Sequence, residues 1–366
     1  YKLQSLYGGK WNDSKNYEEF LNPLKGNTGF MKTPLVSADE FAPIIEEMRK
    51  VPTSGVHNPL KNPERYLLYG EVCRKVSKAL HEEDVFNHFV ELINTVFPKS
   101  KGQATGEMKV TRAFFDNFAG DNVRYLARGF SVPGDHQGQT TCGYRWPYGP
   151  VSIITPFNFP LEIPILQLLG ALFMGNKPLI KVDSKVALPM EEFVRLLIAA
   201  GMPKDDMVFL HTDGKNMEEL MLQCGLKMTM FTGSAKIADQ LTHKLDGRIK
   251  VEDAGYDWKI LGPDVHEVDY VAHFIDHDAY ALSGQKCSAE SLLFYHENWN
   301  KSNLFDKVKS LASKRSFKEL TNCPILSWTN KRIKEHVDSV LKVPGSELLF
   351  GGKPVQEANQ VPDCYG

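Results

Sequence analysis

The chain has 366 residues, a formal net charge of −2 and 24% charged residues. A single hydrophobic core rarely extends beyond roughly 250 to 300 residues, so two lobes are expected. The charge is nearly balanced and no Lys- or Arg-rich run is interleaved with aromatics, which argues against nucleic acid as a partner. The most apolar stretch, 163–174, is interrupted by Gln167 and is shorter than the roughly 18 residues that span a bilayer, so no membrane partner is expected.

The N-terminal part is predicted to be mainly helical, because apolar residues recur at helical spacing over 36–50 and 64–97 and a further helical run covers 107–128. Turn-forming glycines and a Pro-Gly pair then follow over 129–143, which predicts a protruding β-hairpin. From residue 151 onward, short apolar runs alternate with helical segments. This alternation predicts an α/β fold with a parallel sheet, whose strands are Val151–Ile154, Lys177–Val182, Val208–Leu210 and Met228–Phe231.

The six cysteines lie far apart and form no C-x-x-C pair, which indicates free thiols and disfavours structural zinc. A cysteine is most often a small buried core residue. Cys287 is a candidate nucleophile because it follows Gly284 and Lys286, and because Glu252 upstream is a possible base for the water that would release an acyl group. His273 and His277 stand four residues apart, but no third ligand is evident, so no metal site is predicted.

Three further groups have the chemistry of a nucleotide and carbonyl site, and each has an ordinary structural alternative. Gly233-Ser234 follows a strand and precedes a helix, where N–H groups bind phosphate, although serine there is also a common N-cap. Lys181 ends a strand at the edge where parallel sheets bind ligands, or is simply solvated. Asn158 lies between aromatics and prolines after a strand, as an oxyanion donor would, or as a turn residue. Glu252 and Asp253 would face opposite sides of a strand, so at most one enters a given cleft.

These groups, in this order, resemble the aldehyde dehydrogenase superfamily. The resemblance covers nearly the whole chain and rests on five motifs: Thr155-Pro-Phe-Asn-Phe-Pro, Gly175-Asn176 with Lys181, Phe231-Thr-Gly-Ser, Glu252, and Gly284-Gln-Lys-Cys-Ser. The run from Val251 to Pro263 is similar to that of the plant-type delta-1-pyrroline-5-carboxylate (glutamate semialdehyde) dehydrogenases. The resemblance implies a Rossmann-like nucleotide-binding domain (1–129 and 148–255), an oligomerisation hairpin (130–147) and an α/β catalytic domain (256–366), which is incomplete at its C-terminus.

The resemblance also implies roles for individual residues. Cys287 is the nucleophile, Asn158 an oxyanion donor and Glu252 the base, while Ser288 and Phe159 contact the substrate. NAD is the implied cofactor, with Lys181 and Ser184 at the adenosine ribose and Gly233 and Ser234 at the pyrophosphate. The implied cofactor-binding residues are Ile154, Thr155, Pro156, Phe157, Lys181, Ser184, Phe231, Gly233, Ser234 and Ile237.

Three positions depart from the family pattern. Gln167 stands nine residues after Asn158, where many relatives have lysine, so no cation is expected beside the thiol from there. Ser184 replaces the glutamate that many NAD-specific relatives direct at the ribose, with Asp183 as a possible substitute. The chain stops at Gly366 without a Glu-x-Phe-Gly-Pro segment, so the catalytic lobe is expected to be unfinished.

The expected function is NAD-dependent oxidation of L-glutamate γ-semialdehyde to L-glutamate, through a cysteine thiohemiacetal and thioester, in proline catabolism. A different semialdehyde dehydrogenase, an NADP-linked relative, and an inactive truncated subunit that acts only as a binding partner remain open. The subfamily implies a homo-oligomer, at least a dimer, in the mitochondrial matrix. The chain opens at Tyr1 without an Arg-rich leader, so its residues do not reveal the compartment directly.

Overall fold

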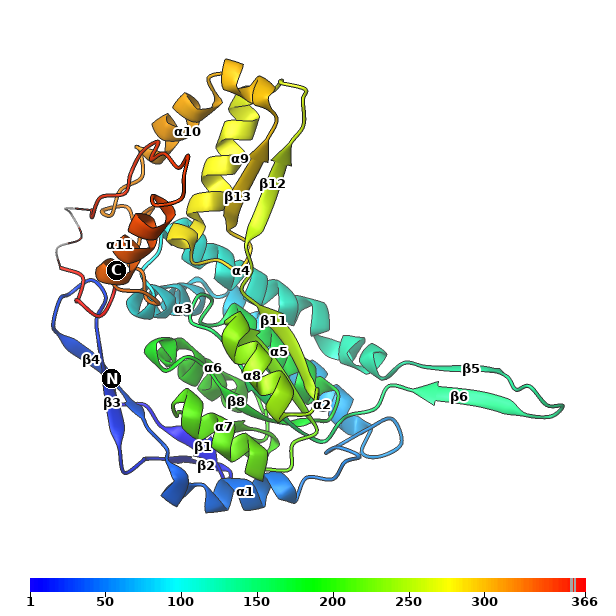
Figure 1. Ribbon diagram of the computed structural model, residues 1–366. Coiled ribbons are helices and arrows are strands. Elements are labelled where there is room, and N and C mark those ends of the chain that lie inside the picture. The colour runs from blue at the N-terminus through cyan, green and yellow to red at the C-terminus, as the bar shows by residue number, and fades with distance from the viewer. Residues whose placement is uncertain (356–357, 359) are drawn as a thin grey trace. The chain divides into compact units, whose positions relative to one another are not determined.

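The computed structural model describes residues 1–355, 358 and 360–366 (Figure 1). The chain divides into two compact units. The first unit contains residues 1–20, 31–93 and 105–253, and the second contains 21–30, 94–104 and 254–366. The principal boundary therefore lies between Asp253 and Ala254, one residue after the candidate base Glu252.

The first unit is built on a sheet with the strand order β11-β10-β7-β8-β9-β1-β2. The strands from β11 to β9 are parallel, whereas β1 is antiparallel to both β9 and β2. Consecutive strands run outward from β7 to β9, and the chain then returns to place β10 on the other side of β7. This switch lies between β7 and β10, where ligands bind in open α/β sheets. The strands are β1 Ser5–Tyr7, β2 Lys10–Asn12, β7 Pro150–Ile154, β8 Lys177–Lys181, β9 Val208–Phe209, β10 Met228–Gly233 and β11 Ile249–Asp253.

Helices cover both faces of this sheet, so β7 and β8 are buried almost throughout, and most of their residues are apolar. Apolar side chains of α1, α7 and α8 form one core with Leu179 and Phe231. On the other face α5 packs against β7 and β8, and α2 packs against α5 and α6. The helices are α1 Ala42–Arg49, α2 Glu64–His81, α3 Glu83–Val96, α4 Lys101–Phe118, α5 Glu162–Phe173, α6 Leu188–Ala199, α7 Gly214–Gln223 and α8 Ala235–Lys244, with short 3-10 turns η1 Ala38–Glu40, η2 Gly120–Ala127, η3 Ser184–Val186 and η4 Lys204–Asp206.

The predicted helical runs and the predicted hairpin are present. The hairpin joins β5, Gly129–Pro133, to β6, Thr140–Tyr144, with all five residue pairs in antiparallel register. Figure 1 shows it extending away from the sheet, and its residues are mostly exposed. The first 34 residues differ from the helical expectation, because they form β1, β2 and the pair β3, Tyr17–Leu21, and β4, Gly29–Pro34.

The second unit has a smaller parallel pair, β12 Asp257–Leu261 and β13 Glu290–Tyr295. Residues of α9 and α10 pack together in its core around Trp299, Ile275 and Leu304. Its helices are α9 Val268–Tyr280, α10 Leu304–Ala312 and α11 Asn330–Val340, with 3-10 turns η5 Ala281–Gly284 and η6 Glu297–Lys301. In neither unit do the described residues include a helix that is both long and apolar enough to cross a bilayer.

Candidate active site

Three of the predicted cofactor residues stand side by side at the carboxyl ends of the parallel strands. Ile154 of β7 is paired with Lys181 of β8 on one side and with Phe231 of β10 on the other. Residues paired across a pleated sheet project to the same face. Phe231 belongs to the core formed with α7 and α8, and Ile154 packs against it. The row Lys181–Ile154–Phe231 therefore faces the α7 and α8 side of the sheet.

Lys181 ends this row with its amine in a poorly solvated position. Burial lowers the pKa of the Lys181 amine below its ordinary value of 10.5. Its Nζ donates a hydrogen bond to the Val182 carbonyl, at 3.2 Å. A desolvated amine at the carboxyl edge of a sheet is able to donate hydrogen bonds to a polar ligand group, and the ligand then replaces part of the lost hydration.

Replacement of Lys181 by methionine is expected to have opposite effects on stability and on nucleotide binding. The free energy of unfolding should rise by about 0.5–2 kcal/mol near neutral pH, because an unfavourably desolvated charge is removed. Nucleotide affinity should fall roughly tenfold to a hundredfold, as expected for loss of a charged donor. Urea unfolding and nucleotide titration measure the two effects, and exposed Lys204→Met is the matched control.

The difference in free energy of unfolding between the wild type and Lys181→Met should change with pH in one direction. The folded wild-type chain holds the Lys181 proton less tightly than the unfolded chain does. The wild-type free energy of unfolding should therefore increase relative to that of Lys181→Met as the pH rises toward 10.5. A difference between the two proteins that stays constant across this range would contradict the assigned desolvation.

The loop after β7 and the turn after β8 approach each other next to Lys181. The Thr155 N–H donates to the Lys181 carbonyl at 3.1 Å. Thr155 Oγ1 is buried and has no hydrogen-bond partner among the described residues. Asp183 forms an ion pair with Lys185 at 3.1 Å, so its carboxylate already has a cationic partner. Ser184 donates its hydroxyl to the Thr212 carbonyl, at 3.4 Å.

The β10–α8 turn places Ser234 at the start of α8 without a side-chain cap. The Ser234 side chain accepts no capping hydrogen bond, although Ser234 stands at the N-cap of α8. The Ser234 carbonyl accepts from Ile237 and Ala238, as a helix start requires. A Cβ on Gly233 would lie 2.7 Å from Phe231 Cζ, so only glycine lets the backbone pass this ring unshifted. The uncapped helix end, the unpaired Thr155 hydroxyl and the Lys181 amine together fit a dinucleotide.

Asn158 lies in the loop that leads into α5 and is 7% exposed. The start of this helix is held by Glu107, a residue of α4 that sequence reasoning did not single out. One oxygen of the Glu107 carboxylate accepts the backbone N–H groups of Leu161, at 2.8 Å, and Glu162, at 3.2 Å. A carboxylate at a helix N-terminus also complements the helix dipole. Glu107 therefore anchors the segment that carries Asn158 and its neighbour Phe159.

Gln167 connects α5 to the sheet on the face opposite the row Lys181–Ile154–Phe231. Its Nε2 donates to Thr232 Oγ1 at 2.8 Å. Thr232 is paired in register with Glu252 on the edge strand β11. Glu252 therefore projects to the same face of the sheet as Thr232, on the side of α5, and it is exposed. Gln167 Oε1 is buried and lacks a partner in the described part of the chain.

The two faces of the sheet thus divide the predicted residues of the first unit. Ile154, Lys181, Phe231 and Gly233 lie at the carboxyl edge on the α7 and α8 side. Glu252 lies on the α5 side with Gln167 and Thr232. This division could be expected only once the strand register was known.

Cys287 and Ser288 belong to the second unit and are both exposed. Cys287 follows η5, in which Leu282, Ser283 and Gly284 all have positive φ values of 51°, 53° and 79°. Left-handed backbone costs about 1–2 kcal/mol for each residue other than glycine. A reactive thiol must be accessible, and Cys287 meets this condition.

Three other cysteines are buried, in contrast to Cys287. Burial raises the pKa of Cys73 and of Cys224 to about 12, and it also raises the pKa of Cys323. These three thiols are therefore protonated at neutral pH and have the ordinary role of small core residues. Each cysteine of the chain is a free thiol in this structure.

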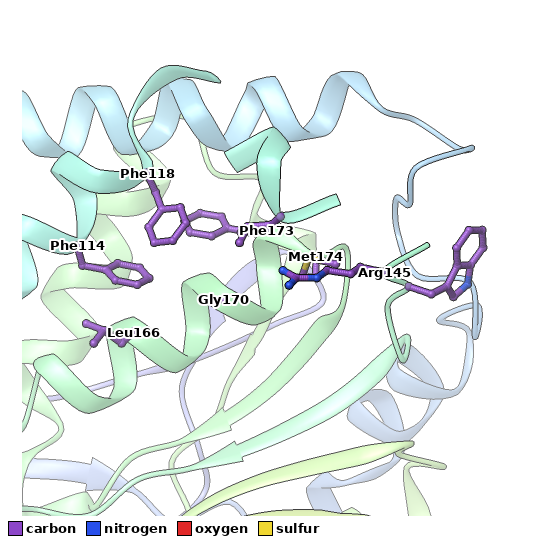
Figure 2. A pocket seen from close by; sticks show the side chains of 9 residues that line it. Phe114, Phe118, Arg145, Leu166, Gly170, Phe173 and Met174 are labelled. Carbon is purple, nitrogen blue, oxygen red and sulfur yellow. The ribbon is translucent and has the colours of Figure 1, made fainter. Parts of the chain in front are cut away.

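Two further features are a pair of histidines on α9 and a cavity in the first unit. Among the described residues, no group of three or more His, Cys, Asp or Glu side chains could hold a metal ion. The rings of exposed His273 and His277 are stacked 5.9 Å apart. The cavity has a volume of about 500 Å³, and its lining is apolar apart from Arg145. Figure 2 shows that Phe114, Phe118 and Phe173 lie together beside it.

Comparison with known proteins identifies relatives that are similar to this chain over its full length. The sequence model of the aldehyde dehydrogenase family matches residues 12–363. The chain is 52% identical to "Delta-1-pyrroline-5-carboxylate dehydrogenase 12A1, mitochondrial" of Arabidopsis thaliana, and 52% identical to "Probable aldehyde dehydrogenase" of Linum usitatissimum. Each alignment covers 100% of this chain, which spans 65% and 66% of the respective relatives.

A solved structure supports the same fold. An NAD-dependent aldehyde dehydrogenase from Sinorhizobium meliloti superposes with a TM-score of 0.84 at 21% identity. The superposition covers 98% of this chain and 71% of that one. The likeness confirms the predicted α/β fold class.

Proposed function

The chain belongs to the aldehyde dehydrogenase family, as its five motifs predicted, and on this premise we propose that it oxidises L-glutamate γ-semialdehyde to L-glutamate with NAD. The observation that carries the proposal is the 52% identity to the Arabidopsis protein, which extends over all of this chain. The exposed thiol of Cys287 and the nucleotide-compatible edge of the sheet support it.

In the proposed reaction the Cys287 thiolate attacks the aldehyde carbon and forms a thiohemiacetal. The negative charge that develops on the former carbonyl oxygen is stabilised by the Asn158 amide and by the Cys287 backbone N–H. Each such donor contributes roughly 3–4 kcal/mol to transition-state stabilisation. Burial of Asn158 and the anchoring of its segment by Glu107 favour this role, because a pre-oriented donor loses little freedom in the transition state.

When bound, NAD would accept the hydride that leaves the thiohemiacetal carbon, and a thioester on Cys287 would remain. Lys181 and Ser184 would hold the adenosine ribose, Gly233 and Ser234 the pyrophosphate, and Ile154, Phe231 and Ile237 the apolar surfaces of the cofactor. The remaining cofactor contacts would come from the loop after β7, namely Thr155, Pro156 and Phe157.

Release of the product requires water. Glu252 takes a proton from a water molecule, which attacks the thioester carbonyl; the C–S bond breaks and Cys287 leaves as thiolate. The net change is aldehyde, NAD and water to carboxylate, NADH and two protons. Ser288 and Phe159 would contact the rest of the substrate.

The hairpin supports a proposed assembly, and the name of a relative supports a proposed location. We propose that the β5–β6 hairpin joins this chain to a second copy, since Phe130, Tyr144 and Trp146 on and beside it are 63%, 54% and 43% exposed. Exposed aromatic side chains that gather on one element are typical of an interface. The Arabidopsis relative is named as mitochondrial, and we propose the mitochondrial matrix for this protein.

An aldehyde panel with both nucleotides tests the proposed substrate and cofactor. The value of kcat/KM should be highest for glutamate γ-semialdehyde with NAD. It should be at least roughly tenfold lower for 5-oxopentanoate, which has the same length but lacks the α-amino group, because a polar subsite is then left unsatisfied. Equal values for the two aldehydes, or a higher value with NADP, would contradict the proposal.

A further inference from the structure

The backbone directly before Cys287 has an unusual conformation that the residues of that segment do not favour by themselves. Leu282 has φ 51° and ψ 32°, Ser283 has φ 53° and ψ 40°, and Gly284 has φ 79°. Only the glycine adopts such angles without a steric penalty. The other two must be held there by interactions from outside the segment.

The segment 323–326, about forty residues further along the same unit, supplies these interactions. Ser283 Oγ accepts the backbone N–H of Cys323 at 2.8 Å. The Cys323 thiol also contacts this hydroxyl, at 3.4 Å. A left-handed serine is thus tied by its side chain to a distant main chain.

The carboxamide of Gln285 makes a second connection, through both its N–H donors and its carbonyl oxygen. Its Nε2 donates to the carbonyls of Pro324, at 2.9 Å, and Leu282, at 3.1 Å. Its Oε1 accepts the N–H of Leu326, at 2.9 Å. One side chain therefore joins the left-handed turn to both ends of the Pro324–Leu326 stretch. Glutamate in its place would keep the size but lose both donors.

We propose that Ser283 and Gln285 are positioning residues, which clamp the left-handed turn to residues 323–326 and thereby set where the Cys287 thiol and backbone N–H stand. The proposal rests on the proposed function, in which Cys287 is the nucleophile. Neither side chain touches a reacting atom in this mechanism. They act through the backbone, because only Lys286 separates Gln285 from Cys287 and a displacement of about 1 Å lowers a rate by roughly a hundredfold.

Two variants of Ser283 distinguish a backbone clamp from other roles of the hydroxyl. Ser283→Ala removes the hydrogen bonds but keeps the penalty for positive φ, so the first-turnover rate of NADH formation should fall roughly tenfold or more. Ser283→Gly removes the same bonds and the penalty as well, so it should recover most of the wild-type rate. Exposed Ser310→Ala, in the same unit, is the matched control. Wild-type rates for Ser283→Ala, or equal losses in both variants, would overturn the proposal.

Gln285→Glu separates positioning from general damage to the unit. The first-turnover rate of this variant should fall at least tenfold, while its KM changes less than about threefold. The rate at which iodoacetamide alkylates Cys287, measured across pH, should also change less than about threefold. Alkylation needs an accessible thiolate but no oriented oxyanion donor. Exposed Gln360→Glu, in the same unit, is the control. A parallel loss of alkylation and turnover would show a merely structural role and would overturn the proposal.

Failure of the proposed function is distinguishable from failure of the clamp. If wild-type NADH formation does not depend on Cys287, the proposed function is wrong. Hydrogen exchange of the peptide 282–289 then still decides whether the clamp holds the turn. Faster exchange in Gln285→Glu than in the wild type supports the clamp, and equal exchange overturns it.

Discussion

Replacement of Cys287 by alanine is expected to lower NADH formation from glutamate γ-semialdehyde by at least roughly a thousandfold. Without the thiolate no tetrahedral intermediate with a charged oxygen forms, and an aldehyde by itself does not release hydride. Single-turnover and steady-state absorbance of NADH measure the effect. Folding should be unaffected, because Cys287 is exposed and its side chain fills no core.

Cys142→Ala provides the matched control for this experiment. Cys142 is also an exposed free thiol, but it lies on the hairpin strand β6. Its removal should leave the rate within about twofold, as is usual for a surface substitution. If Cys287→Ala and Cys142→Ala had the same activity as the wild type, covalent catalysis by Cys287 would be refuted.

Glu252→Gln should separate the two halves of the proposed reaction. The first turnover should form NADH, because thiolate attack and hydride loss do not need this carboxylate as base. Steady-state turnover should then fall roughly a hundredfold to ten-thousandfold, which is the range contributed by general-base catalysis. A burst of NADH close to one per active chain, with an acyl group on the Cys287 peptide by mass spectrometry, is the expected result.

Asp253→Asn is the control for Glu252→Gln because it removes a neighbouring exposed carboxylate on the same strand. Successive side chains on a strand point to opposite faces, and Glu252 shares its face with Thr232. Asp253 is paired with Gly233 on the other face, so Asp253→Asn should show no burst of NADH followed by slow turnover. Loss of the burst itself in Glu252→Gln would show that Glu252 acts before hydride transfer and would contradict its assignment.

Strands built largely of apolar residues were predictable, whereas strands that depend on distant partners were not. Parallel strands such as β7 and β8 are buried on both faces, and continuous apolar runs indicate them directly. The strand β1 has only three residues and joins the sheet through a pairing of Leu6 with Phe209. Nothing local in Ser5–Tyr7 signals a partner two hundred residues away.

In the candidate site, too, some features were predictable from the sequence and others were not. The motifs identified Asn158, Lys181, Glu252 and Cys287 as residues with suitable chemistry, and for Gln167 the sequence showed only that an expected lysine is absent. The hydrogen bond from Gln167 to Thr232 joins residues 65 positions apart. Anchoring of the Asn158 segment by Glu107 likewise joins α4 to α5. Such pairs have no periodicity or spacing that a sequence could display.

The amino-acid sequence by itself determined the α/β class, the hairpin, the family and the residue types available for thiolate chemistry, because apolar periodicity, turn residues and motif spacing are local properties of the chain. Tertiary structure alone decided that Lys181, Ile154 and Phe231 form one row, that Glu252 projects to the opposite face, and that a left-handed turn precedes Cys287. Strand register and side-chain hydrogen bonds between remote segments set these features, and both arise only when packing brings those segments together.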